Sequence, residues 1–290
     1  MIVAVRIITI AVLIWLIAGL WLTIGILAGE EGDVAPGSHR AGVTARKQRN
    51  PDFAVSVESV LSGRKEKQDI VLVDIRSPEK FEQFSIPGSI NIPLFAVKTK
   101  AFLKSQLLVL VDEGYRICRL ERACGDLRKS GFAVRYLKGG LSSWRDTGAP
   151  LTGDVFAQRE LNRVPSRIFF EEKECENWLV IDVSRTGAAG KELFPRSVSI
   201  PYSETGEFTE RLKATIQESH RIPPASVLVV DETGEHCETL ERRLKAEGLK
   251  SIFFLQGGLE AYETFLKNQA MARKAKGNSK RTIRKCAGCP

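Results

Sequence analysis

The chain contains one pattern of strands, turns and prolines twice, and this repeat constrains its fold more than any other feature. In the first copy, the apolar run 70–73 ends in Asp74, and Pro93 follows nineteen residues after that Asp. The second copy shows the same spacing between Asp182 and Pro201. Each copy is about 100 residues long, which is enough to bury a hydrophobic core of its own. The sequence therefore predicts two similar domains rather than a solenoid of short repeats.

Short apolar runs alternate with helical patterns along each copy. In the first copy, strands are predicted at 70–73, 107–111 and 133–137, and a helix over 117–130 connects the last two. Strands that alternate with helices favour a mainly parallel sheet covered by helices on both faces. Leading helices are also predicted for the two copies, at 56–61 and 168–178.

Several short motifs occur in the first copy in a fixed order. They are Asp74-Ile75-Arg76, a helix that begins near Pro78, the segment Pro87-Gly88-Ser89-Ile90-Asn91-Ile92-Pro93, and Gly139-Gly140 with Trp144. Together these motifs resemble the signature of a rhodanese-like domain. The resemblance implies an α/β fold class in which each copy forms a mainly parallel five-stranded sheet with helices on both faces.

The second copy keeps only part of this signature. Asp182 matches Asp74, and the pair Gly257-Gly258 matches Gly139-Gly140. The resemblance implies that Asp74 and Asp182 are structural, each ending its strand and accepting hydrogen bonds from nearby loop backbone. Arg76 belongs to the same structural motif.

The resemblance also implies where the chemistry should lie. In an active rhodanese, the loop after the fourth strand begins with a Cys, whose sulfur is held by backbone N–H groups while it carries a persulfide. The matching positions here hold Asp112 and Asp231. A carboxylate accepts hydrogen bonds from such a loop but does not carry a sulfane sulfur. The remaining loop residues expected to take part in binding are Gly114, Arg116, Gly234 and His236, where His236 replaces the usual Arg.

Two further cysteines are candidate displaced nucleophiles. Cys118 and Cys237 each follow the loop Asp by six residues, in the expected first turn of the next helix. A helix N-terminus lowers a thiol pKa, which would make either residue reactive. The alternative is that both are small residues packed in the core, as is expected for Cys124 and Cys175 on their helical patterns.

The carboxyl end is basic and contains a Cys pair. Residues 267–290 hold eight Lys or Arg and no acid, so they account for the whole net charge of +8. The two domains therefore carry no net positive charge, and no nucleic-acid partner is predicted. Cys286 and Cys289 form a redox disulfide, contribute half of a metal site, or belong to a solvent-exposed tail. No metal and no cofactor are predicted, since only three His are scattered along the chain.

The amino-terminal region favours membrane attachment. The run 7–28 has 22 residues without a charge. As a helix, it spans about 33 Å, enough for a hydrocarbon core of about 30 Å. A cleaved signal peptide is the alternative, although the run is longer than a usual signal core. The acids just after the run favour exported domains, whereas the basic residues further along favour a cytoplasmic side.

The predicted organisation is a transmembrane anchor at 1–29, a flexible linker at 30–50, rhodanese-like domains at 51–150 and 165–267 joined by a connector at 151–164, and a disordered basic tail at 268–290. We expect a single-pass protein of the bacterial inner membrane with periplasmic domains.

The expected function is a non-catalytic binding or scaffolding module linked to sulfur or redox metabolism. Its partners would be the membrane and a protein or sulfane-sulfur carrier. An enzyme is the alternative: a sulfurtransferase or thiol-redox protein using Cys118, Cys237 or the terminal pair Cys286 and Cys289. A sensor that binds a small oxyanion is a third possibility, which repulsion from Asp112 and Asp231 disfavours.

Overall fold

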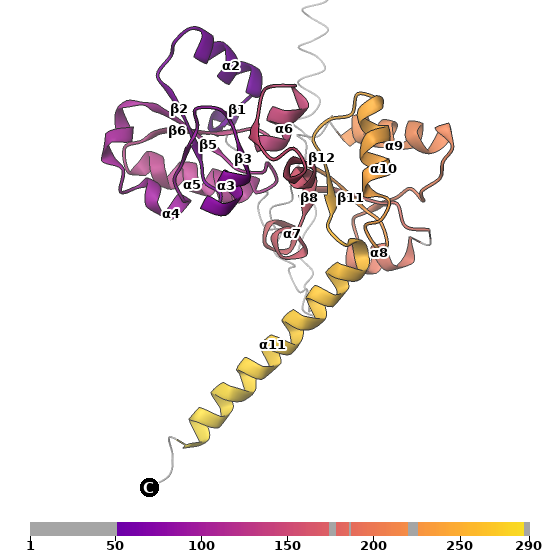
Figure 1. The fold of residues 1–290 in the computed structure, drawn as a ribbon. Helices are drawn as coiled ribbons and strands as arrows, with labels where there is room; N and C mark the ends of the chain where they lie inside the picture. The colour runs from indigo at the N-terminus through magenta and orange to yellow at the C-terminus, as the bar shows by residue number, and fades with distance from the viewer. Residues whose placement is uncertain (1–50, 174–177, 186, 220–225, 287–290) are drawn as a thin grey trace, which may run out of the picture. The chain divides into compact units, whose positions relative to one another are not determined.

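The computed structural model describes residues 51–173, 178–185, 187–219 and 226–286 (Figure 1). The predicted anchor and linker lie outside these ranges. Among the helices that are described, none combines the length and the apolar character needed to cross a bilayer.

The first half of the chain forms a five-stranded, fully parallel sheet in the order β1-β6-β5-β2-β4. The central strand β5 reads Leu-Leu-Val-Leu-Val, and its side chains alternate between two hydrophobic cores. A strand buried on both faces needs such a continuous apolar run. The strands are β1 (Ala54–Val55), β2 (Ile70–Asp74), β4 (Ile90–Asn91), β5 (Leu107–Val111) and β6 (Ala133–Leu137).

Helices cover both faces of this sheet, as predicted. One core is closed by α5 and by the segment that connects β4 to β5, and the other by α2 and α6. A small antiparallel pair, β3 with β7, lies beside them. The elements are η1 (Pro51–Phe53), α2 (Val57–Lys65), α3 (Pro78–Gln83), β3 (Phe84–Ser85), α4 (Leu94–Val97), η2 (Ala101–Ser105), α5 (Ile117–Lys129), α6 (Gly140–Asp146), β7 (Thr152–Gly153) and η3 (Ala157–Asn162).

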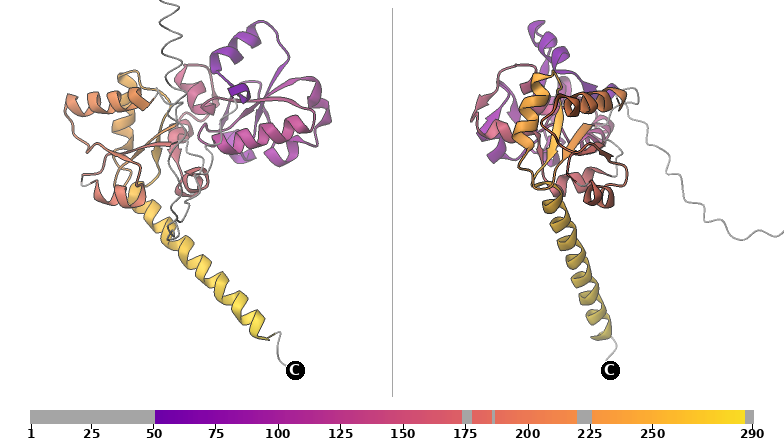
Figure 2. Two further views of the ribbon diagram at one scale, coloured as in Figure 1. Left: turned by 180° about the vertical axis from the view of Figure 1, so that it is seen from behind. Right: turned by 90° about the vertical axis from the view of Figure 1, so that its right-hand side faces the viewer.

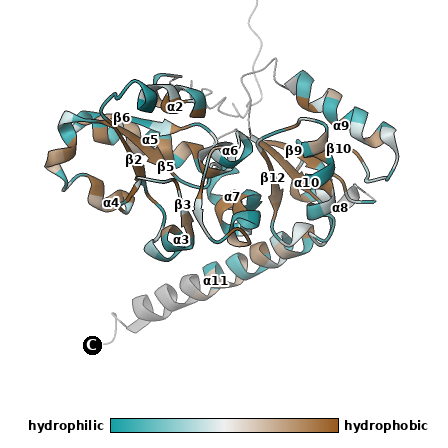
Figure 3. Cartoon of the chain, turned by 45° about the horizontal axis from the view of Figure 1, so that its top comes forward, coloured by the Kyte–Doolittle hydropathy of each residue, from teal (hydrophilic) through white to brown (hydrophobic). Residues whose placement is uncertain are grey.

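The second half builds another fully parallel five-stranded sheet, in the order β10-β9-β11-β12-β8. Read from β8, this is the order of the first sheet, so the repeat in sequence is a repeat in topology. Hydrophobic colour follows the strands of both sheets in Figure 3. The elements are β8 (Arg163–Val164), α7 (Ser166–Glu172), β9 (Trp178–Asp182), α8 (Ala188–Leu193), β10 (Val198–Ser199), α9 (Gly206–Ser219), β11 (Ser226–Val230), α10 (Cys237–Ala246), β12 (Ile252–Leu255) and α11 (Gly258–Cys286).

The two halves contact each other through the loop that follows β5. Tyr115 of this loop is buried in the aromatic core of the second half, where its ring centroid lies 5.7 Å from that of Phe253 in an edge-to-face arrangement. The hydroxyls of Ser143 and Ser251 are 3.0 Å apart across the same contact. The loop after β5 is therefore fixed by the first half, to which it belongs, and by the aromatic core of the second half, in which Tyr115 is buried.

Two predictions about secondary structure were wrong. The helix expected over 168–178 ends at Glu172, and Trp178 begins β9, because its aromatic and β-branched run pairs along β11. The tail after 267 is not an irregular extension: α11 continues to Cys286 and runs on past the second sheet (Figure 2). Ala, Lys and Arg are frequent in this stretch and are strong helix formers.

Candidate functional site

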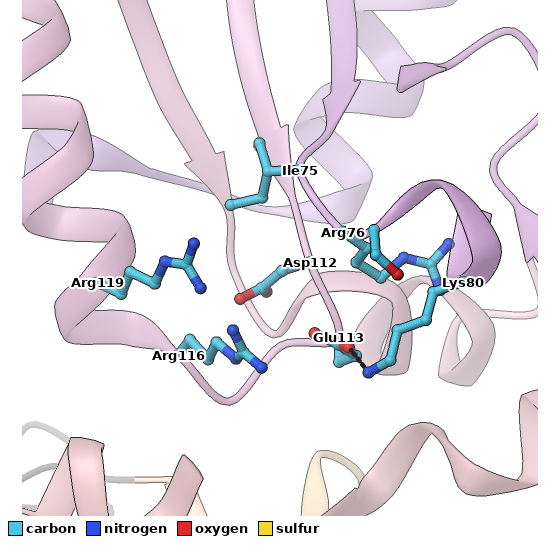
Figure 4. Close-up of a pocket in the computed structure, with 8 residues that line it drawn as sticks. Ile75, Arg76, Lys80, Asp112, Glu113, Arg116 and Arg119 are labelled. Atoms are coloured by element: carbon cyan, nitrogen blue, oxygen red, sulfur yellow. Dashed lines mark hydrogen bonds and ion pairs between the residues drawn. The ribbon is translucent and has the colours of Figure 1, made fainter. Parts of the chain in front are cut away.

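A cavity of about 210 Å³ opens at the carboxyl ends of β2 and β5 in the first half (Figure 4). This is the edge at which open α/β sheets ordinarily bind ligands. Side chains from the turn after β2, from α3, from the loop after β5 and from the start of α5 line it. They are Ile75, Arg76, Ser77, Lys80, Asp112, Glu113, Arg116 and Arg119.

The loop after β5 is shaped by close backbone contact with the Gly-Gly turn before α6. Gly114 has φ +118°, and a Cβ on it would lie 2.1 Å from the carbonyl oxygen of Gly139. The first N–H groups of α6, from Leu141 and Ser142, donate to the carbonyls of the loop, at 2.8 and 3.2 Å. A helix N-terminus has such donors to spare, so it fixes the loop without any side chain.

The second half repeats this arrangement. The N–H of Leu259, at the start of α11, donates to the carbonyl of Asp231 at 2.9 Å. Gly258 comes so close to the same loop that a Cβ would lie 2.5 Å from that carbonyl. The Gly-Gly-Leu sequence shared by the two copies is therefore explained by one contact made twice.

Asp112 is a buried carboxyl in the cavity with a strongly shifted pKa. Its Oδ1 accepts the N–H of Gly114 at 2.8 Å, whereas its buried Oδ2 has no hydrogen-bond partner among the described residues. Burial raises the pKa of this carboxyl to about 7, and the neighbouring Glu113 adds to the rise, while Arg116 opposes it. With a pKa near neutrality and one unpaired oxygen, Asp112 can accept a proton or a hydrogen bond from a ligand.

The charges around Asp112 are unevenly paired. Lys80 reaches across from α3 to Glu113 at 2.5 Å (Figure 4). Burial raises the pKa of Glu113, but Lys80, Arg116 and a backbone hydrogen bond together lower it below its ordinary value. The Nε of Arg116 is buried and has no hydrogen-bond partner among the described residues. Figure 4 shows Arg116 and Arg119 on one side of Asp112, with Glu113 and Lys80 on the other. The residues lining this cavity therefore include one buried acceptor, Asp112 Oδ2, and one buried donor, Arg116 Nε, that have no hydrogen-bond partner among the described residues.

Asp74, Arg76 and Asp182, which were predicted to be structural, make hydrogen bonds at the ends of β2 and β9. Asp74 accepts the N–H of Arg76 at 3.0 Å and forms a buried, bidentate pair with its guanidinium. The same guanidinium donates to the carbonyl of Phe84 at 2.6 Å. Asp182 accepts the N–H of Ser184 at 2.9 Å, so both aspartates bind loop backbone as expected.

In the loop that follows β11, the backbone donates hydrogen bonds to the carboxylate of Asp231, which belongs to the same loop. Asp231 accepts the N–H groups of Gly234 and His236, at 2.9 and 3.2 Å, using both of its oxygens. The imidazole Nδ1 of His236 lies 3.5 Å from Oδ2, and its ring centroid lies 4.9 Å from that of Tyr202. Little of Asp231 remains to bind a ligand.

Neither of the two candidate nucleophiles, Cys118 and Cys237, is an exposed free thiol. Cys118 is in a disulfide. Cys237 is free but buried at the start of α10, and burial, with Asp231 second, raises its thiol pKa to about 12. The predicted lowering at a helix N-terminus is therefore wrong for Cys237, because desolvation outweighs the helix dipole. Cys124 is buried in the core, as predicted.

The predictions for Cys175, Cys289 and the side chain of Cys286 fall outside what the structure describes. Within the described residues, no three His, Cys, Asp or Glu side chains group closely enough to hold a metal ion.

Four charged residues of the site were not found from the sequence: Lys80, Glu113, Arg119 and Glu172. Glu172 comes from α7 of the second half, and its Oε2 accepts the N–H of Cys118, at the start of α5, at 3.0 Å. Burial raises the pKa of Glu172, against the effect of that N–H. Of these four, only Glu113 could have been expected from the sequence, because it directly follows Asp112 in the predicted loop. Glu172 joins the site through contact between the halves, which no local pattern shows.

Comparison with known proteins covers the first half. Residues 57–147 match the family model for the rhodanese-like domain. A sulfurtransferase of Allochromatium vinosum is 28% identical over 100 residues, which is 33% of this chain and 92% of that protein. The HTH-type transcriptional regulator Rv0324 of Mycobacterium tuberculosis is 26% identical over 113 residues, 35% of this chain. The match spans only 46% of that regulator's own length.

Solved structures also match the chain, with low TM-scores. The thiosulfate sulfurtransferase of Pseudomonas aeruginosa has a TM-score of 0.32 at 17% identity, covering 73% of this chain and 42% of its own. The Alr3790 protein of Anabaena sp. has a TM-score of 0.31 at 25% identity, covering 41% of this chain and 93% of its own.

Proposed function

Residues 57–147 form a rhodanese-like domain, and on this premise we propose that the protein is a non-catalytic binding module of the rhodanese-like superfamily. The first half would bind a small polar ligand in the cavity at Asp112. The second half, a second and more divergent rhodanese-like domain, would serve as its support. The observation that carries the proposal is the pair of orphaned buried atoms in the cavity, Asp112 Oδ2 and Arg116 Nε.

The chemistry of sulfur transfer argues against catalysis at this loop. A thiolate would attack the outer sulfur of thiosulfate, form a new S–S bond and release sulfite. The carboxylate of Asp112 has no sulfur with which to form that bond. The nearby thiols do not replace it, because Cys118 is in a disulfide and Cys237 is buried with a raised pKa.

The orphaned atoms define the kind of ligand. When Asp112 is ionised, Oδ2 needs a donor, while Arg116 Nε needs an acceptor. A group that carries both side by side, such as a carboxamide, a peptide group or a protonated oxyanion, satisfies the two. A fully ionised oxyanion offers only acceptors, and it would face the carboxylate unpaired. Satisfying two buried polar atoms is worth more than making the same bonds at a surface.

Attachment to a membrane and export belong to the same proposal. The uncharged run 7–28 supports a single-pass anchor. The disulfide at Cys118 supports an oxidising compartment, because disulfides are rare where cellular thiols are kept reduced. The protein would then present its cavity in the periplasm to a partner or a small molecule.

Intact-mass measurement after incubation with thiosulfate tests the lack of sulfur transfer. The wild-type protein should gain no sulfur atom, whereas Asp112→Cys should gain one, because the cavity beside position 112 admits the donor. Asp231→Cys is the matched control and should react more slowly, since the second loop is closed on itself. Persulfide on Cys237 of the wild type would make the protein a sulfurtransferase instead.

Titration calorimetry at pH 8 with two probes tests the ligand chemistry. Hydrogen phosphate, which carries a donor, should bind about tenfold more tightly than sulfate, which carries none. Asp112→Asn replaces an acceptor with a donor and should reverse this order. Equal binding of both anions, or the same order in wild type and variant, would mean that Asp112 does not select the ligand.

A further inference from the structure

A second surface of the first half has the composition of a membrane-contact site. It is the aromatic–basic segment, residues 94–105, which connects β4 to β5 and contains α4 and η2. Val97 and Leu103 point inward and are buried in the core beneath α5. Phe95 and Phe102 are 86% and 69% exposed. Since Val97 and Leu103 anchor the backbone, the two exposed rings are presented by a fixed structure.

The charge of this segment is of one sign. Lys98, Lys100 and Lys104 are exposed, and the segment contains no acid. The Nζ of Lys104 lies 5.3 Å from the ring centroid of Phe132, which holds this charge against the edge of the domain. Figure 3 shows the apolar α4 on the outside of the first half. Exposed aromatic rings among lysines are the composition by which helices and loops bind at the lipid headgroup boundary.

The described chain enters the first half at Pro51, beside the edge strand β1 of the sheet. Phe53, at its beginning, packs against the same core cluster as Leu103 and Phe132. The guanidinium of Arg128 stacks over Phe53 at 4.3 Å and donates to the carbonyl of Asp52 at 2.9 Å. The chain that precedes this point consists of the polar stretch 30–50 and the uncharged run 7–28.

We propose that the aromatic–basic segment rests on an anionic phospholipid bilayer, with the rings of Phe95 and Phe102 at the headgroup boundary and the three lysines against lipid phosphates. Charge complementarity between the three lysines and anionic lipid supports this contact, which does not depend on the ligand of the Asp112 cavity. Lysines near a bilayer surface are attracted to anionic headgroups, and the rings add apolar contact. A second copy meeting this segment face to face would oppose like charges instead.

Hydrogen–deuterium exchange on the full-length protein in lipid nanodiscs tests this surface. Discs of phosphatidylglycerol are compared with discs of phosphatidylcholine and with detergent micelles. We expect amides of 94–105 to exchange about tenfold more slowly in the phosphatidylglycerol discs. Peptides that cover Phe156, which is 72% exposed outside this segment, serve as the internal control and should not change.

Two sets of variants separate the contributions. Phe95→Ser with Phe102→Ser should remove the protection, and Lys98→Gln with Lys100→Gln and Lys104→Gln should remove its dependence on anionic lipid. Phe156→Ser is the matched control. Equal exchange in discs and detergent would overturn the proposal, as would failure of the full chain to stay in the discs. Protection that requires two protein copies in one disc would also overturn it, in favour of self-association.

Discussion

The two loops that follow β5 and β11 place an Asp at the same position and leave it in opposite states. Asp231 has both oxygens engaged by backbone N–H groups of its own loop. Asp112 receives a single backbone N–H, keeps one oxygen unpaired, and faces a cavity. The second loop has one residue more between the Asp and the next helix, and this residue lets its backbone turn back onto the carboxylate.

The proposed division into a binding half and a supporting half rests on this difference. The loop of the second half satisfies its buried polar groups internally, which stabilises the fold and leaves nothing to bind. The loop of the first half leaves an acceptor and a donor unsatisfied, at a cost of about 1–3 kcal/mol for each buried group. Each such group needs an explanation, and a ligand that completes the hydrogen bonding is one of them.

The largest expected effect separates the two aspartates that end β2 and β9. Asp74→Ala leaves the buried guanidinium of Arg76 without its partner, which should cost roughly 3–5 kcal/mol of unfolding free energy. Asp182→Ala removes the acceptor for one backbone N–H and should cost about 1–2 kcal/mol. Urea denaturation of both variants measures the difference. Equal losses would show that the buried ion pair adds nothing to the first half.

A smaller effect is expected at the loop glycines. Gly114→Ala places a methyl group 2.1 Å from the Gly139 carbonyl, so the loop has to move, at a cost of about 3 kcal/mol. The equivalent methyl group in Gly234→Ala meets backbone at 3.0 Å and should cost about 1 kcal/mol. Denaturation midpoints give the stabilities. If both substitutions cost the same, the two loops do not differ in how tightly they pack on the Gly-Gly turns.

The sequence predicted the architecture well because its signals are local and periodic. The apolar runs of β2 and β5, the α5 pattern and the Gly-Gly turns each depend on a few adjacent residues, and all were found. The strand at Trp178 was taken for the end of a helix, because short apolar runs fit both periods.

Of the candidate binding residues, the sequence predicted only those in the loop after β5, namely Asp112, Gly114 and Arg116. Glu172 and Lys80 reach the start of α5 and the cavity from other elements, and the burial that raises the pKa of Asp112 exists only in the folded protein. Desolvation of Cys237 likewise reversed an expectation based on its place in the helix.

The pH dependence of stability should distinguish Asp112 from the rest of the protein. Its pKa is about 7 in the folded protein against an ordinary value of 3.8, so the folded state holds more protons between these two pH values. The contribution of Asp112 to the free energy of unfolding is then most favourable below about pH 4, and it falls as the pH rises towards 7. Asp112→Asn should remove this loss and be more stable than wild type at pH 8, on the order of 2 kcal/mol.

Denaturation curves between pH 4 and 8 measure this slope. Asp231→Asn is the control and should keep it, because Asp112 is still present. A wild-type protein that gains stability as pH rises from 5 to 7, with no change in Asp112→Asn, would show that Asp112 is not the group responsible.

The smallest effect concerns the thiol of Cys237, whose pKa is raised to about 12 first by burial and then by Asp231. Asp231→Asn removes the negative charge and should lower that pKa, so that alkylation of Cys237 by iodoacetamide becomes several-fold faster at pH 8. Cys124 is the internal control, because burial raises its pKa to about 12 as well but Asp231 is not among the causes. If the variant merely unfolds more often, both cysteines label faster together. A higher ratio of Cys237 to Cys124 labelling, measured by peptide mass spectrometry, isolates the electrostatic contribution of Asp231. An unchanged ratio would mean that burial alone keeps this thiol inert.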